Sequence, residues 1–264
     1  MKTYMNMALL ALLICSCEPT NGRGDTFTDP ISRVDPRAKK LELPAFEKDE
    51  HVLDYDGFTS SYNHTTLIPN WVAYELTSVE LDGSYDTRSS NFSRDPNLEG
   101  PQASREDYSN SGWDKGHMAP KADMRWSSSA YWQSHYFTNV CPQNHNFNAG
   151  DWNTLEKQVR KWAKKYGKVW VVCGPIFTDR EFGTIGHAKV QVPDLFFKAL
   201  LIKNGSDYSA IAYVMPNRAK HHPLKEYACT IDDLEEMIGR DLFPKLDDHI
   251  ETKVESEISW LYWQ

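Results

Sequence analysis

Runs of apolar residues that end at glycine, proline or asparagine predict the strands of this chain. NWVAYELTSVEL (70–81) has mixed apolar alternation and is followed by Asp82-Gly83, which predicts a β-strand and then a turn. KVWVVCGPIF (168–177) is almost continuously apolar until Gly174-Pro175, a pattern typical of a strand covered on both faces. These two segments are predicted to belong to a sheet.

A third and a fourth strand are predicted as a hairpin. DLFFKALLIK (194–203) and YSAIAYVMP (208–216) flank an Asn204-Gly205 step, which is a frequent hairpin turn between two apolar runs. Because such turns join neighbouring antiparallel strands, the sheet is predicted to be antiparallel in this part of the chain.

Helical periodicity appears between these strands and again after the last one. In AGDWNTLEKQVRKWAKKYG (149–167), Asp151 is the expected N-cap and Gly167 the expected end, with one apolar stripe made of Trp152, Leu155, Val159, Trp162 and Tyr166. A second helix is predicted from Thr230 in TIDDLEEMIGRDLF (230–243). Strands and helices are mixed without regular alternation, which predicts an α+β domain with a central antiparallel sheet flanked by helices.

The first 17 residues are typical of an export signal. Lys2 precedes an apolar run from Met7 to Ile14, which is too short to span a bilayer. Ile14-Cys15-Ser16-Cys17 resembles a bacterial lipoprotein cleavage box, so we expect an exported lipoprotein that is anchored by a lipid on Cys17 and faces the periplasm or the cell surface. An ordinary secretory signal or an apolar start without a targeting role are the alternatives.

Composition divides the rest of the chain into a tether and one domain. Residues 18–50 are rich in Pro, Gly, Asp, Lys and Glu and predict a solvated tether, which leaves 51–264 as a single domain. Beyond Cys17 the chain has Cys141, Cys173 and Cys229, an odd number without a CxxC pair. A disulfide framework and a structural zinc site are therefore not expected.

The charge balance limits the kind of nucleic-acid partner that fits the chain. A formal net charge of -8 repels polyanions at long range, so the sequence argues against a protein that coats nucleic acid. Transient catalysis on nucleic acid remains compatible with it. The basic run KQVRKWAKKYGK (157–168) either supplies a local positive field or is a solvated helix face.

Candidate chemistry begins at SGWDKGHMAP (111–120). Gly112 and Pro120 bound the segment, which indicates a shaped turn or strand end around His117, although an isolated histidine would most simply be a surface residue.

Glu156 and Arg160 fall on one flank of the apolar helix stripe, where they form either an ordinary i,i+4 ion pair or part of a site. Between them and His117 lies FTNVCPQNHNFNAGDW (137–152), whose side-chain amides are candidate oxygen ligands for a cation such as Mg²⁺: Asn139, Gln143, Asn144, Asn146 and Asn148.

Together these motifs resemble the DNA/RNA non-specific endonuclease family, the group of Serratia nuclease and mitochondrial endonuclease G with a ββα-metal (His-Me finger) site. The resemblance rests on WDKGHMAPKADMRWS, FTNVCPQNHNFNAGDWNTLEKQVRKWA and VWVVCGPIF, and it runs from about Trp71 to Phe243. It implies that His117 is the general base and that Asn148 is the metal-binding amide. It further implies that Glu156 holds the metal through water and that Arg160 contacts phosphate.

The resemblance implies supporting roles for further residues. Asn139 and Gln143 match a segment that supports the site, and Asp114 matches the acid of the histidine box, which orients the loop. A further phosphate-binding arginine is expected upstream, with Arg88 as the choice and Arg94 as the alternative. Lys115 replaces the arginine that the family usually has, and it loses the planar guanidinium that binds phosphate through two hydrogen bonds. A purely structural role for Lys115 beside Asp114 is equally compatible.

The implied function is a metal-dependent, sugar-non-specific endonuclease. Mg²⁺ is the expected ion, with Mn²⁺ or Ca²⁺ as substitutes, DNA and RNA are the expected substrates, and the products would carry 5′-phosphates. The alternative, from another class, is a surface lipoprotein that binds nucleic acid on the same fold with weakened catalysis. Lys115 favours the alternative, whereas His117, Asn148, Glu156 and Arg160 speak against it.

Overall fold

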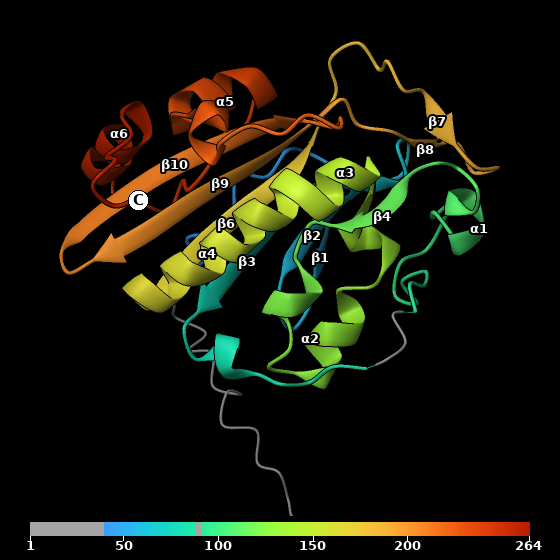
Figure 1. Cartoon of the computed structure of the whole chain (residues 1–264), viewed down its shortest axis with the longest axis horizontal. Helices are drawn as coiled ribbons and strands as arrows, with labels where there is room; N and C mark the ends of the chain where they lie inside the picture. The colour runs from blue at the N-terminus through green and yellow to red at the C-terminus, as the bar shows by residue number, and fades with distance from the viewer. Residues whose placement is uncertain (1–39, 88–90) are drawn as a thin grey trace, which may run out of the picture. The chain divides into compact units, whose positions relative to one another are not determined.

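A computed structural model describes residues 40–87 and 91–264 and has a seven-stranded sheet at its centre (Figure 1). The strand order is β1-β2-β3-β6-β9-β10-β11, and every neighbouring pair is antiparallel. The strands are β1 His51–Asp54, β2 Thr59–Asn63, β3 Ile68–Thr77, β6 Lys168–Ile176, β9 Leu195–Asn204, β10 Asp207–Pro216 and β11 Ala228–Cys229. The predicted fold class, an α+β domain with an antiparallel sheet, is confirmed.

The predicted hairpin is present as β9 and β10. Asn204 pairs with Asp207 across the turn, and Gly205 has a φ of 63°, a left-handed conformation that glycine adopts without strain. β9 also pairs along its length with β6, so these strands form the middle of the sheet. The predicted strand at 70–81 ends at Thr77, and a short 3₁₀ turn, Glu80–Asp82, replaces its last residues.

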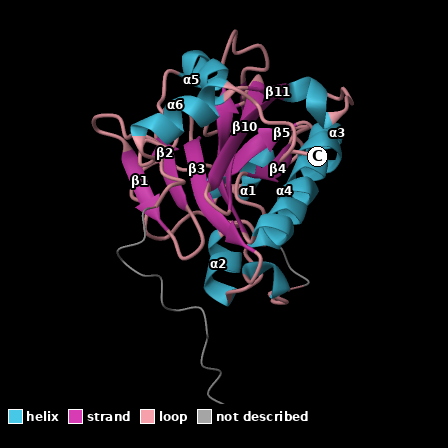
Figure 2. Cartoon of the chain, turned by 90° about the vertical axis from the view of Figure 1, so that its left-hand side faces the viewer, coloured by secondary structure: helices cyan, strands magenta, loops and turns pink. Residues whose placement is uncertain are grey.

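Helices cover both faces of the sheet. Figure 2 shows the strands between α4 (Asn153–Tyr166) on one side and α5 (Ile231–Ile238) and α6 (Asp248–Ser256) on the other. Alternate residues of β6 follow this division: Val171 packs in the cluster that contains α4 residues, and Val172 packs in the cluster that contains α5 residues. Two covered faces explain why the central strands β6, β9 and β10 of this antiparallel sheet are almost continuously apolar.

The two predicted helices are present with adjusted ends. The residues of the expected stripe are buried, except Tyr166, which is half-buried; Trp152 directly precedes α4 and the other four lie in it. α5 begins directly after Thr230, whose side chain accepts a hydrogen bond from Asp233 N at 3.1 Å. It ends at Ile238, with Gly239 as its C-cap, rather than at residue 243.

Residues 40–50 do not form the solvated tether that their composition predicts. Leu41 and Leu43 are buried against the α5 side of the sheet, and the ring of Phe46 stacks on Trp71 at 5.7 Å. The backbone N–H of Ala45 also donates to Asp241 O at 2.9 Å. The folded domain therefore includes this segment, because its few apolar side chains find a complementary surface. The expected export signal, Cys17 and tether residues 18–39 lie outside the described residues.

Shorter elements complete the domain. They are α1 Arg105–Tyr108, α2 Ser128–Gln133, α3 His145–Phe147, a separate pair of strands β4 Asp114–His117 and β5 Val140–Gln143, and a second pair β7 Thr184–Ile185 and β8 Val190–Gln191. Within the described ranges, no helix has the length and apolar character needed to cross a bilayer.

Candidate active site

Two short strands and a helix bring most of the candidate residues together. β4 pairs with β5 in antiparallel register, with His117 opposite Val140 and Asp114 opposite Gln143. The chain then turns through α3 and a π-helical turn, Asn148–Trp152, before it enters α4. This order, two antiparallel strands followed by a helix, corresponds to the ββα arrangement that the family resemblance implies.

His117 is held at the end of β4 by contacts to its backbone and its ring. Trp152 Nε1 donates to the carbonyl of His117 at 3.3 Å. The ring lies 5.0 Å from Phe92 and 5.1 Å from His135, measured between centroids. Its Nε2 is buried and has no hydrogen-bond partner among the described residues. The imidazole therefore has a fixed position and an uncommitted nitrogen.

The protonation state of His117 follows from this enclosure. Burial, with smaller contributions from His135 and Lys121, lowers the pKa of His117 from 6.5 to about 3. The imidazole is consequently neutral at pH 7, the form that accepts a proton.

Asp114 connects the strand to the π-helical turn. Its Oδ2 accepts a hydrogen bond from Asn148 Nδ2 at 3.0 Å and lies 2.9 Å from His145 Nδ1. Because an amide that donates through nitrogen must turn its oxygen the other way, Asn148 Oδ1 is left available, with no hydrogen bond to any described residue. A neutral amide oxygen in this orientation is a suitable ligand for a hard cation.

A π-helical turn shapes the start of α4. Gly150 has φ −96° and ψ −105°, which are not helical values, so the backbone widens where Asn148 faces Asp114. Asp151, the predicted N-cap, lies inside this turn instead. Its carboxylate accepts hydrogen bonds from Tyr227 Oη at 2.6 Å and from the backbone N–H of His222 at 3.2 Å. Asp151 therefore ties the turn to the segment after β10 and does not cap the helix.

Glu156 lies one turn into α4 without a hydrogen bond to any described residue. Burial raises its pKa to about 7; Asp123 adds to this rise, whereas Lys198 and Arg160 oppose it. A carboxylate with free oxygens in a partly enclosed site can accept hydrogen bonds from water.

Arg160 pairs with a residue that the sequence did not single out. Its Nη1 donates to Asp123 Oδ1 at 2.8 Å, and the two side chains are 21% and 0% exposed. The predicted partner, Glu156, lies on the same flank but forms no ion pair with Arg160 within 4.0 Å. The reason is that the turn after His117, Lys121–Asp123, brings a second carboxylate to the helix. One edge of the Arg160 guanidinium is thereby fixed while the side chain keeps some exposure.

Asn139 directly precedes β5, and Gln143 is the last residue of β5. The two side chains support the segment around His117 in different ways. Asn139 exchanges hydrogen bonds with both backbone groups of Ala119, at 2.8 and 2.9 Å, and so fixes the turn after His117. Gln143 packs over Gly116, where a Cβ would lie only 2.0 Å from the Gln143 Oε1. Both amide atoms of Gln143 are buried and lack partners among the described residues. A glycine is therefore required at position 116, because the Gln143 side chain lies too close to leave room for a Cβ.

The basic residues around the strand pair take different positions. Lys115 Nζ lies 5.6 Å from the ring centroids of both Phe92 and Tyr108, a cation–π arrangement rather than an ion pair with Asp114. Arg94 is exposed. Its positive charge opposes the rise in the pKa of Tyr62 that burial causes, and it helps to lower the pKa of Asp107. Arg88, the first choice for the upstream arginine, lies outside the described residues.

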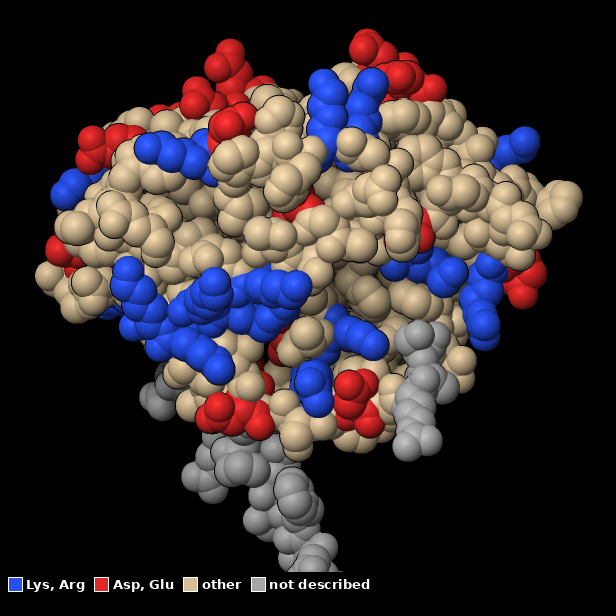
Figure 3. Space-filling model, viewed as in Figure 1, with Lys and Arg blue, Asp and Glu red and all other residues tan. Residues whose placement is uncertain are grey.

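A basic surface adjoins Arg160. Figure 3 shows a band of lysine and arginine side chains over the region of α4. Beside it is a hollow of ≈ 290 Å³ whose lining includes Arg125, Arg160, Lys161 and Lys164. The molecule thus has the local positive charge that its net charge does not indicate.

Two further residues belong to this region but were missed by the sequence analysis. Asp123 follows His117 by six positions, and only its pairing with Arg160 reveals its place. Lys198 is fully buried in β9, with Nζ 4.4 Å from the centroid of Trp152 and no hydrogen-bond partner among the described residues. A lysine in the middle of the apolar run DLFFKALLIK was the available signal for Lys198.

Comparison with known proteins identifies several nucleases. "Nuclease EXOG, mitochondrial" of Xenopus laevis is 36% identical over 210 residues, 73% of this chain and 58% of the frog protein. "Endonuclease G, mitochondrial" of Homo sapiens is 32% identical over 204 residues, 72% of this chain and 69% of the human protein. This chain thus spans less than two thirds of the frog protein's length. A solved chain of the EndoG/EndoGI complex superposes with a TM-score of 0.72 at 26% identity, covering 80% of this chain and 91% of that one.

These relatives contradict the predicted location. The sequence predicts an exported bacterial lipoprotein, whereas the frog and human proteins both carry mitochondrial names. An apolar start that ends in cysteines is a short local pattern, and it weighs less than similarity along most of the domain. The lipoprotein prediction is therefore wrong by this comparison.

The family assignment rests on the longest match. The family model described as "DNA/RNA non-specific endonuclease" matches residues 39–249, which include β4, β5, α4 and the whole central sheet. Its start also agrees with the packing of residues 40–50 against the sheet. This chain belongs to the DNA/RNA non-specific endonuclease family.

Proposed function

We propose that this chain is a divalent-metal-dependent endonuclease that hydrolyses phosphodiester bonds in both DNA and RNA and leaves 5′-phosphates. The observation that carries the proposal is the Asp114–Asn148 hydrogen bond, which turns a free amide oxygen outward in the same ββα unit that holds a neutral His117. An oxygen ligand and a proton acceptor are the two groups that metal-assisted hydrolysis needs.

The residues fit a hard cation such as Mg²⁺, with Mn²⁺ or Ca²⁺ as substitutes. Asn148 Oδ1 would hold the ion directly, and Glu156 would accept hydrogen bonds from its water ligands. A bound ion of this kind polarises a phosphate oxygen and neutralises charge on the departing oxygen. The free carboxylate oxygens of Glu156 and the fixed Asn148 amide support this assignment.

His117 would act as the general base. Its neutral imidazole can take a proton from the attacking water, and Phe92 and His135 restrict the ring to one position. His135 is a poor candidate for the same role because it is fully buried and its Nδ1 is 2.8 Å from Tyr131 O.

Substrate phosphates would bind to the positive side of the site. Arg160 keeps N–H groups that Asp123 does not use, and the hollow beside it adds Arg125, Lys161 and Lys164. Lys115 and one upstream arginine, Arg88 or Arg94, would add further positive charge. Contacts of this kind reach sugar and phosphate rather than base edges, which supports activity on both DNA and RNA.

The test is cleavage of supercoiled plasmid and of RNA by the purified chain, with Mg²⁺ or with EDTA. We expect both substrates to be cut only with the metal, and His117→Ala to lose at least about 100-fold in rate, the lower range for a general base. His249→Ala, at an exposed position on α6, is the matched control and should retain activity. Intact substrates across Mg²⁺, Mn²⁺ and Ca²⁺ would refute the proposed activity, and rapid cleavage by His117→Ala would refute the assigned base.

A further inference from the structure

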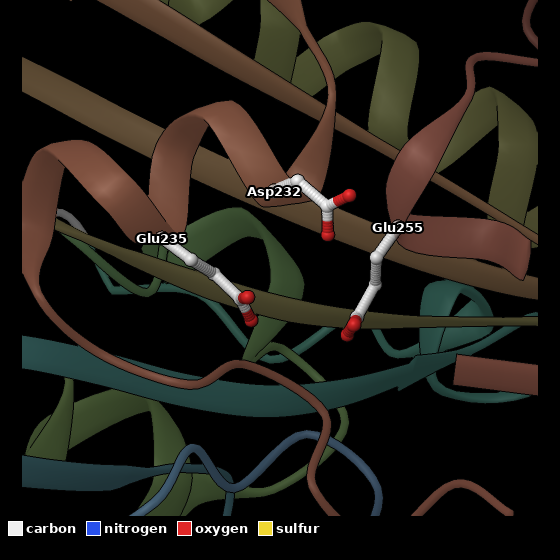
Figure 4. A group of neighbouring side chains, drawn as sticks. All are labelled: Asp232, Glu235 and Glu255. Carbon is white, nitrogen blue, oxygen red and sulfur yellow. The ribbon is translucent and has the colours of Figure 1, made fainter. Parts of the chain in front are cut away.

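Three carboxylates meet between α5 and α6, on the sheet face opposite α4. Asp232 and Glu235 lie three residues apart on one side of α5, and Glu255 reaches toward them from α6 (Figure 4). One oxygen from each carboxylate lies within 4.8 Å of the other two. The active-site candidates do not contribute to this cluster, which belongs to a different layer of the fold.

Glu255 is the unusual member, because its carboxylate is enclosed without a partner. The residue is only 6% exposed, and its Oε1 has no hydrogen bond within the part of the chain that the structure describes. Figure 4 shows this carboxylate pointing into the space between the two helices. A buried carboxylate without a partner destabilises the fold unless it is neutralised by a proton or coordinated by a cation.

The surroundings of Glu255 add negative charge rather than relieve it. Apart from burial, the groups that raise its pKa are Glu235, Glu251, Asp241 and Asp232, all of them carboxyl groups. Glu251 on α6 also has a buried oxygen, Oε1, without a hydrogen-bond partner. Glu235 uses one oxygen to accept from Leu242 N at 2.6 Å and keeps the other free. The cluster therefore offers several uncommitted oxygens to a positive ion.

We propose that Asp232, Glu235 and Glu255 form a calcium-binding site that ties α6 to α5. Ca²⁺ takes oxygens at about 2.3–2.6 Å, so it can contact two oxygens up to about 5 Å apart, which covers the observed spacing. Mg²⁺ binds at about 2.0–2.1 Å, needs near-ideal octahedral geometry and keeps several of its waters, so three carboxylates from two helices suit it less well than the flexible coordination of Ca²⁺. Asp232 is exposed, which leaves room for the water ligands that complete a calcium shell.

Calcium at this site would stabilise the fold without taking part in hydrolysis. The ion would join a helix that begins after β11 to the helix near the C-terminus, and it would remove the repulsion among the carboxylates. Because the folded chain binds the ion and the unfolded chain does not, thermal stability should rise with the concentration of free Ca²⁺.

The experiment compares the full chain with Glu255→Gln and with Glu236→Gln. Glu236 is an exposed glutamate on α5, the helix of Asp232 and Glu235, but outside the cluster, so it controls for the loss of one charge. We expect Ca²⁺ to raise the melting temperature of the wild type and of Glu236→Gln, measured against EDTA. Glu255→Gln should melt above the wild type in EDTA and show almost no rise with Ca²⁺, and calorimetry should give at least about tenfold weaker Ca²⁺ binding.

Further arms separate this site from the active site. Asn148→Ala should keep the Ca²⁺-dependent rise, and Glu255→Gln should keep wild-type nuclease activity in Mg²⁺. Glu235→Gln is the second variant if Glu255→Gln does not fold. The proposal is overturned if Ca²⁺ does not stabilise the wild type, if Glu255→Gln retains the rise, or if Asn148→Ala abolishes it. The carboxylates would then share protons rather than a metal ion.

Discussion

Asp114 accepts a hydrogen bond from the side-chain amide of Asn148 at 3.0 Å and thereby decides which way that amide points. Asp114→Asn keeps the size of the side chain but removes the acceptor-only character that specifies this orientation. We expect the Mg²⁺ concentration for half-maximal activity to rise at least about 10-fold, as is typical when a partner of a metal ligand is lost, with much of the rate recovered at saturating Mg²⁺.

His145→Ala is the matched control for this prediction. It removes the other contact of the same Asp114 oxygen, at 2.9 Å, and leaves the Asn148 hydrogen bond intact. A Mg²⁺ titration of cleavage should give near-wild-type values for this variant. Equal Mg²⁺ requirements for Asp114→Asn and the wild type would show that Asp114 does not orient the amide.

Asp123 and Arg160 form a pair whose rupture leaves a charge in a partly enclosed site. Asp123→Asn should lower the free energy of unfolding by about 3 kcal/mol, the range for breaking one side of a buried ion pair, and should also reduce the rate because Arg160 loses its fixed position. Urea unfolding measures the first effect.

The double variant Asp123→Asn with Arg160→Met should be more stable than Asp123→Asn alone, because both charges are then absent. A loss below about 1 kcal/mol in the single variant would indicate a pair that solvent screens like a surface ion pair.

The contrast between predicted and unpredicted features follows from how far apart the partners lie in the chain. The hairpin turn at Gly205 and the apolar stripe of α4 are local patterns, so periodicity and turn residues were sufficient to predict them. The Asp114–Asn148 and Arg160–Asp123 contacts join residues 34 and 37 positions apart. No periodic pattern encodes such contacts, and only the family resemblance placed some of these residues together.

Other differences arise where tertiary packing overrides composition. Leu41 and Leu43 lie in a segment with the composition of a tether, yet the α5 side of the sheet buries them. Lys198 is a polar interruption in an apolar strand, yet it is fully buried and its Nζ lies 4.4 Å from the ring centroid of Trp152. In both cases the local sequence is compatible with exposure, and the surface provided by distant elements decides the outcome.

Lys198 should control the pH range over which Glu156 is ionised. Its charge lowers the pKa of Glu156, which burial raises to about 7. Lys198→Met fills a similar volume without the charge, so the Glu156 pKa should rise and the acid limb of the pH–rate profile should move to higher pH. We expect a loss of about 10-fold at pH 6.5 and a smaller one at pH 9.

Lys203→Met, at an exposed position near the end of the same strand, is the control for the Lys198 variant. Its pH–rate profile should coincide with that of the wild type. A uniform rate loss at every pH in Lys198→Met would point to a packing defect instead of an electrostatic effect on Glu156.

His117 should also make the stability of the fold depend on pH. Burial lowers its pKa from 6.5 to about 3, so between these values the unfolded chain binds a proton that the folded chain does not. The stabilising contribution of the neutral ring is therefore complete above pH 6.5 and is lost as the pH falls toward 3. Because His117 as a residue is half-buried although its Nε2 is buried, solvent screens part of the effect. We expect a loss on the order of 1 kcal/mol between pH 7.5 and 4.5 that His117→Asn removes. Denaturant unfolding at both pH values measures it, with His249→Asn as the exposed control. If wild type and His117→Asn lose the same free energy of unfolding between the two pH values, His117 is not held neutral by the fold.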